Sequence, residues 1–171
     1  MMKNIEEIKI SSYDVEQRVF TYSYYVGEAR RNSGVPLKLA ASIQASTDDH
    51  AQLNYHIEVA TSELVKMINS YFCVCKYSSK NDEVHDGYMI STFMLTPPQY
   101  FPDNLLGELQ KMMTNYLVMR TLQQWILQHK PDDAVITASE AERITLQLRE
   151  LMNSRVKPHN IIRRTRKNIE I

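Results

Sequence analysis

Two long segments of the chain carry apolar residues at the three- and four-residue spacing of an amphipathic helix, and a strand-like segment lies between them. The first helical segment spans about residues 47 to 72, and the second spans about residues 103 to 129. Asp48 and Asp49 suit the start of the first, where the helix dipole favours negative charge. Its apolar positions are Leu53, Ile57, Ala60, Leu64, Ile68 and Phe72. The pattern predicts helix, hairpin and helix in that order.

The segment between the two helices has the features of a β-hairpin. Residues 73–78 and 88–95 read as strands, and Pro97 and Pro98 stop the second one. The polar loop between them ends in the turn dipeptide Asp86-Gly87. We therefore expect a two-stranded hairpin at about residues 73–95 that projects from one end of the helices. Because an isolated hairpin is marginally stable in water, it should need its own helices or a partner's strands to pack on.

The helix at about 103–129 is apolar over an unusually wide arc. A helix of this kind is usually packed on two sides, so we expect it to be the central helix. Its apolar residues are Leu105, Leu106, Leu109, Met112, Met113, Tyr116, Leu117, Met119, Ile126 and Leu127.

The segment 12–32 has two readings. Its apolar residues recur at steps of four, three, four and three, which favours a helix that Ser12 would cap. A strand is the alternative, because residues 19–26 alternate and are rich in β-formers. Residues 5–10 are too short to assign.

A further helix is predicted near the C-terminus. Thr137 and Glu140 have the T-x-x-E spacing of a capping box, and the apolar residues after them continue to about Ser154. The chain is therefore expected to be α+β and predominantly α, a three- to four-helix bundle with an inserted two-stranded hairpin. Residues 1–157 should form a single domain, and residues 158–171 a basic C-terminal arm.

Charge is unevenly distributed although the net charge of the 171 residues is zero. Residues 155–171 hold six basic residues and one acidic residue, a charge of +5, and the remainder holds 14 and 19, a charge of −5. This arm could be solvated, could dock on an acidic protein surface, or could neutralise nucleic-acid phosphates. The candidate contact residues are Arg163, Arg164, Arg166 and Lys167.

Motifs for reactive chemistry are missing from the sequence. Cys73, Cys75 and His85 lack the paired spacing of a zinc site, and the acidic loop around Asp82 lacks calcium-loop spacing. Neither a metalloprotease helix, a nucleophile elbow nor a glycine-rich phosphate loop is present. We expect a non-enzymatic protein with no cofactor, no metal site and no catalytic residues.

Tyrosine is abundant, with ten residues in the chain. Tyrosine gives a rigid contact area with a polar end, and it is enriched at protein interfaces. Core packing and hairpin pairing could also absorb these rings, but too many aromatic residues lie near position 22 for one helix face to bury. The candidate interface residues are Phe20, Tyr24, Tyr25, Tyr77, Tyr88 and Phe93.

The stretch from Leu53 to His129, with the hairpin at Cys73–Leu95, resembles the small connector, neck or completion proteins of tailed-phage virions. The resemblance implies a structural virion component at the head–tail connection, which oligomerises through hairpins and terminal arms and catalyses nothing. The partners we expect are proteins, in a homo-oligomer or a larger assembly. The alternative is a nucleic-acid-associated or regulatory module that uses the basic arm.

Neither a secretory signal nor a membrane-spanning run is evident in the sequence. Its apolar runs fall short of the roughly 18 residues that cross a bilayer, and Glu6 and Glu7 interrupt the N-terminus. The expected location is the cytoplasm where the chain is made, with no membrane association, and the virion if the chain comes from a phage.

Overall fold

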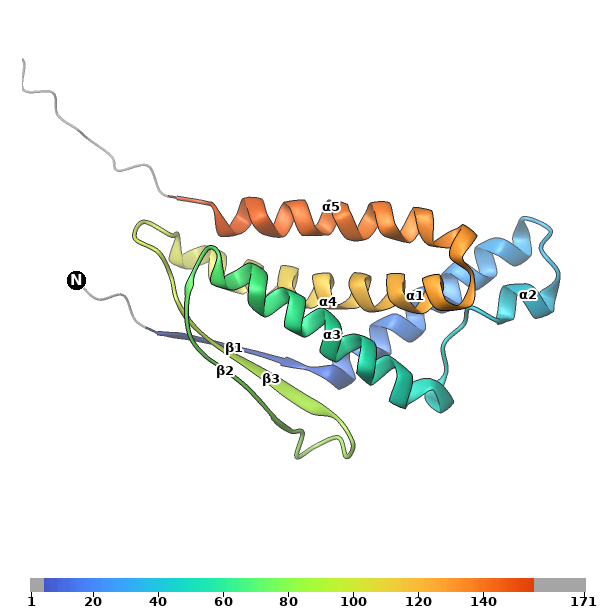
Figure 1. Cartoon of the computed structure of the whole chain (residues 1–171), viewed down its shortest axis with the longest axis horizontal. Coiled ribbons are helices and arrows are strands. Elements are labelled where there is room, and N and C mark those ends of the chain that lie inside the picture. Colours follow the sequence, from blue (N-terminus) through green and yellow to red (C-terminus); the bar gives the residue numbers. More distant parts are fainter. Residues whose placement is uncertain (1–4, 156–171) are drawn as a thin grey trace, which may run out of the picture.

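A computed structural model describes residues 5–155 and shows an α+β chain that is mainly helical (Figure 1). Its turns of 3₁₀ helix lie at Thr47–Asp49, Asp103–Leu105 and Pro131–Asp133. The strands and α-helices, in chain order, are β1 (Glu6–Ser11), α1 (Ser12–Asn32), α2 (Leu37–Ala41), α3 (His50–Asn69), β2 (Cys73–Asn81), β3 (Met89–Thr96), α4 (Leu106–His129) and α5 (Ala134–Met152).

The predicted fold class is confirmed, but the sheet has three strands where the sequence predicted two. Strand order is β1-β3-β2, and both pairings are antiparallel. The third strand is the segment that was too short to assign from sequence. Its Ile8 and Ile10 alternate onto the buried face, and Ile8 lies opposite Phe93. β3 is therefore an interior strand.

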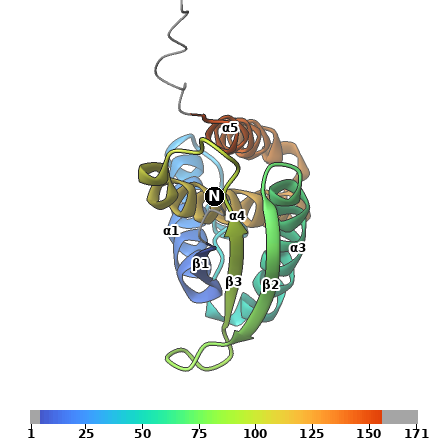
Figure 2. The ribbon, with the colours of Figure 1, turned by 90° about the vertical axis from the view of Figure 1, so that its left-hand side faces the viewer.

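Helices cover one face of this sheet. α1, α3 and α4 contact the strands, whereas α5 packs on α4 (Figure 2). The prediction that α4 is central is confirmed, because it contacts α1, α3 and α5. Its single tryptophan, Trp125, is buried and donates its indole N–H to the carbonyl oxygen of Ile43 at 2.8 Å.

The hairpin packs on the helices and does not project from them. Phe93 and Leu95 on β3 are fully buried in the same core as Leu64, Met113 and Leu148. Burial of each such side chain contributes about 1.5–3 kcal/mol, so the sheet is part of the folding unit.

Segment 12–32 is a helix, as favoured, but the predicted cap is displaced by one residue. The Ser11 hydroxyl accepts a hydrogen bond from the Tyr13 N–H, so Ser11 is the cap, while the Ser12 hydroxyl accepts from the N–H of Met89. At its other end, Gly27 lets α1 approach the α2 segment closely. A Cβ at this position would lie 3.0 Å from the carbonyl oxygen of Ala40.

The capping box predicted for the last helix is wrong. α5 begins at Ala134, three residues before Thr137, directly after the turn at Pro131–Asp133. The Thr137 hydroxyl is buried and donates to the carbonyl oxygen of Ala134, and Glu140 pairs with Arg143. The T-x-x-E spacing therefore falls inside the helix, where both side chains bond to other residues of the same helix.

Within residues 5–155, no helix is both long enough and apolar enough to cross a bilayer. The predicted basic arm, with Arg163, Arg164, Arg166 and Lys167, lies outside the described residues.

Candidate functional site

A buried carboxylate ties the hairpin to the helices. Glu16 on α1 is completely buried, and its two oxygens accept hydrogen bonds from different elements. One oxygen lies 2.8 Å from Nδ1 of His50 at the start of α3, and the other lies 3.3 Å from the Tyr88 hydroxyl beside β3. Burial, and then the Glu16 carboxylate, raise the pKa of Tyr88 above its ordinary value of 10.0, so this hydroxyl keeps its proton and donates.

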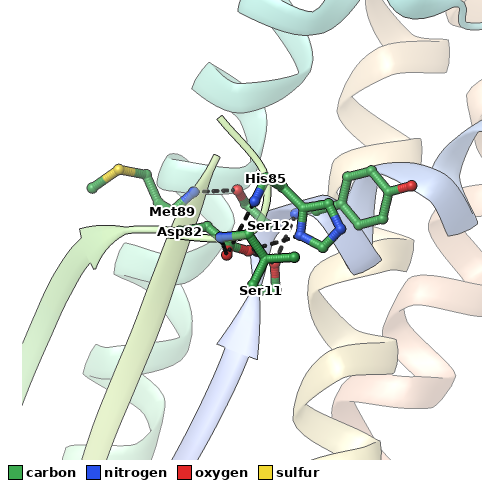
Figure 3. A network of polar contacts seen from close by, with 7 residues as sticks. Ser11, Ser12, Asp82, His85 and Met89 are labelled. Carbon is green, nitrogen blue, oxygen red and sulfur yellow. Dashed lines mark hydrogen bonds and ion pairs between the residues drawn. The ribbon is translucent and has the colours of Figure 1, made fainter. Parts of the chain in front are cut away.

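A second carboxylate holds the loop between β2 and β3. Asp82 is buried, and Figure 3 shows its side chain between Ser11 and His85. It accepts from the N–H of Val84 at 2.9 Å and from the Ser11 hydroxyl at 3.0 Å, and it lies 3.2 Å from Nδ1 of His85. The Val84 N–H, with help from His85 and Ser11, lowers the pKa of Asp82 to about 2.

Aromatic rings join the two carboxylate networks. The Tyr13 ring stacks on the His85 imidazole with 3.8 Å between centroids, and it is nearly perpendicular to the Tyr88 ring at 5.1 Å. The Tyr88 ring also meets the His50 ring at 4.6 Å. We call these residues the hairpin clasp; its members are Ser11, Tyr13, Glu16, His50, Asp82, His85 and Tyr88.

The hydrogen bonds of the hairpin clasp hold elements of the fold together. His50 uses Nδ1 for Glu16 and Nε2 for the side-chain amide of Asn54 at 2.9 Å, so neither ring nitrogen is left for a substrate. Among the residues described by the structure, no three His, Cys, Asp or Glu side chains gather in a way that could hold a metal ion. The clasp fixes the turn of the hairpin, and with it the course of β2.

The sheet has two edge strands, β1 and β2, and their outward backbone groups are bonded differently. At the β1 margin, Nε2 of Gln110 on α4 donates to the main-chain oxygen of Lys9 at 3.0 Å. This bond satisfies a backbone group that points away from β3, so α4 partly closes that margin.

The β2 margin is open. The Asp82 N–H donates to the Tyr88 carbonyl at 2.8 Å, which makes this pair hydrogen-bonded across the hairpin. Because hydrogen-bonded pairs alternate in an antiparallel ladder, the registered pairs at Lys80, Ser78 and Lys76 also bond to β3. Hence the intervening residues, Tyr77, Ser79 and Asn81, direct their N–H and C=O groups outward. We call this row the β2 edge.

Side chains do not cover the β2 edge. Residues 76 to 81 are all exposed, and the Tyr77 ring leans back over β3, 5.3 Å from the Phe93 ring. A β-bulge between Val74 and Lys76 marks where the regular edge begins.

The face of the sheet away from the helices is also open. It forms a shallow groove of about 640 Å³, in which Ile90 and Met94 are half-buried. Lys76 and Lys80 line it from the β2 side, and Lys9, which pairs with Glu7 at 3.3 Å, lines it from β1.

A separate groove of about 680 Å³ lies between α3, α4 and α5. Its arginine, Arg120, donates through Nε and Nη2 to one oxygen of Glu63, at 3.0 and 2.7 Å, and through Nη1 to Gln123. Burial, and then the charge of Glu63, raise the pKa of Tyr116 to about 12. Through its bonds to Glu63, the Arg120 guanidinium joins α4 to α3.

The predicted interface residues separate into exposed and buried groups. Tyr24 and Tyr25 lie 52% and 62% exposed on α1, with ring centroids 6.1 Å apart, and Tyr77 is 41% exposed on β2. Phe93 is fully buried and Phe20 is half-buried against the core.

Two of these interface assignments need correction. Phe93 belongs to the core because it lies on the face of β3 that packs on the helices, opposite Ile8 of β1, and Tyr88 is half-buried in the hairpin clasp. Of the acidic residues in the loop between β2 and β3, Asp82 is buried, whereas Glu83 and Asp86 are exposed.

Sequence reasoning missed Glu16 and His50 as partners, since 34 residues separate them. Glu16 did carry a signal: it lies one residue after Val15 and three before Val19, on the buried side of α1. A carboxylate on an apolar helix face needs a buried partner.

No protein-family model, curated protein or solved structure matches this chain.

Proposed function

We propose that this chain is a non-enzymatic assembly protein that docks into a larger protein complex, with the β2 edge as its docking strand. The observation that carries the proposal is the contrast between the two margins of the sheet. Gln110 bonds to the β1 margin, whereas Tyr77, Ser79 and Asn81 direct backbone donors and acceptors outward from an exposed strand. An edge of this kind is a template for a partner's strand.

The hairpin clasp supports the same function. An edge binds a strand well only when it is straight and fixed before the partner arrives, because ordering it on binding would cost affinity. Glu16 and Asp82 fix the loop that follows β2 through bonds to α1, α3 and β1. The non-enzymatic part of the proposal rests on His50, whose ring nitrogens both bond to protein groups.

Strand addition can be tested with short fluorescent peptides. The probes are nine-residue peptides of alternating threonine and valine, with glutamate in one set and lysine in the other at the third and seventh positions. Fluorescence anisotropy of the full chain should show binding of at least one set. Ser79→Pro should abolish it, because proline removes an outward N–H while the ladder to β3 stays intact.

Ser79→Ala is the matched control, since it removes the hydroxyl and keeps the N–H. Asn81→Pro repeats the block at a second outward N–H in case one proline disturbs the fold, and circular dichroism checks both variants. If no peptide binds the wild type, or if both proline variants bind as well as Ser79→Ala, docking through the β2 edge is wrong.

Self-association belongs to the same proposal, and the exposed pair Tyr24 and Tyr25 supports it. Light scattering at several concentrations should give a mass above 20.0 kDa. Tyr24→Ala with Tyr25→Ala should lower this mass if the pair lies in the contact. A constant mass of one chain would remove self-association from the proposal. A role in a phage virion stays a hypothesis.

A further inference from the structure

We infer that the β2 edge selects an extended segment with acidic residues four positions apart, and that this segment comes from a different protein. The inference rests on the proposed docking function and adds the chemistry of the partner. Lys76 and Lys80 stand on the same face of β2, and both are exposed.

The geometry of an added strand places acidic side chains beside these lysines. Lys76 and Lys80 bond through their backbones to β3, so toward a new antiparallel strand they occupy the non-hydrogen-bonded positions. Facing residues at such positions have Cα atoms about 4.5 Å apart, and their side chains are closer than at the hydrogen-bonded positions. Residues opposite two positions four apart are themselves four apart on the partner.

Glu7, Asp82 and Glu83 also line the groove, but the pairing of its charges leaves positive charge at the β2 edge. Lys9 is paired with Glu7, whereas among the described residues no carboxylate forms an ion pair with Lys76 or Lys80. Opposite charges across a strand pair stabilise it, and like charges directly opposite destabilise it. An acidic segment would therefore form a stabilising pair of opposite charges with each of the two lysines.

The same lysines disfavour a second copy of β2. Pairing the edge with itself would place two lysines from each copy, four in all, on one face of two adjoining strands. Edge lysines are one way in which proteins prevent pairing between identical edges. Ser78, between the lysines, is small and leaves room for the partner's middle side chain.

The test compares the glutamate and lysine peptides described above, on the full chain at about 0.05 M salt. The glutamate peptide should bind about tenfold more tightly, and the preference should shrink at about 0.5 M salt, where screening is stronger. A third peptide, with glutamates at positions three and six, puts its charges on opposite faces and should lose the advantage.

Charge reversal gives the decisive variant. Lys76→Glu with Lys80→Glu should reverse the preference in favour of the lysine peptide. Lys38→Glu with Lys111→Glu, at exposed sites on α2 and α4, changes the net charge equally and should leave it unaltered.

The two proposals can fail separately. If both peptides bind equally and Ser79→Pro abolishes both, the edge docks strands but does not select acidic ones, and this inference is overturned. If neither peptide binds, docking at the edge fails as well.

Discussion

At the scale of single residues, Asp82 accepts hydrogen bonds from more protein donors than a solvated loop carboxylate would. The Val84 N–H is the largest influence, with further bonds from His85 and Ser11, and together they lower its pKa to about 2 from an ordinary 3.8. Because the pKa is lower in the folded state, the carboxylate contributes stability above about pH 3.8. That contribution is lost as the pH falls toward about 2.

The pH prediction is therefore specific to Asp82. Between pH 5 and 2, the urea midpoint of the wild type should fall more steeply than that of Asp82→Asn, which lacks the titrating group. Asp86→Asn, an exposed change in the same loop, should follow the wild type. Parallel wild-type and Asp82→Asn curves would show that the bonds to Asp82 do not favour its ionised form.

At the scale of elements, Glu16 connects α1, α3 and the hairpin. Glu16→Ala would leave the Tyr88 hydroxyl and Nδ1 of His50 without their acceptor, and should lower the free energy of unfolding by about 2–4 kcal/mol. Tyr88→Phe removes one bond and should cost about 1 kcal/mol. Urea unfolding followed by circular dichroism measures both.

The neighbouring residue provides the control for Glu16. Gln17 is exposed on the next position of α1, and Gln17→Ala should change the unfolding free energy by less than about 0.5 kcal/mol. A Glu16→Ala variant as stable as Gln17→Ala would mean that the clasp does not hold these elements together.

At the scale of the whole molecule, the sheet and the helices share one core. Phe93 from β3 and Trp125 from α4 both belong to it. Phe93→Ala should therefore cost about 3–5 kcal/mol, and Trp125 fluorescence and circular dichroism should move together in one transition.

Tyr24→Ala, at an exposed aromatic residue on α1, is the matched surface variant and should shift the monomer's unfolding free energy by less than about 0.5 kcal/mol. Two separate transitions in Phe93→Ala, one for each probe, would contradict a shared core.

Local patterns were sufficient for the two long helices α3 and α4. Leu53 to Ile68 bury one face of α3 as their spacing predicted, and the wide apolar arc of α4 matches its contacts with three other helices. The turn at Asp86-Gly87 was also predicted correctly, and Gly87 has the positive φ of +82° that such turns require. These features depend on residues close together in the chain, so the sequence contains them directly.

What only the tertiary structure decided is which distant segments meet. β1 pairs with β3 across more than 75 residues, and this pairing places Ile8 opposite the buried Phe93 and leaves β2 as the open edge. Glu16, His50 and Tyr88 likewise come together only in the fold. The periodicity of a segment records which of its faces is buried but not which partner buries it. The sequence by itself therefore determined the long helices and the hairpin, and the long-range packing decided the sheet, the clasp and the edge.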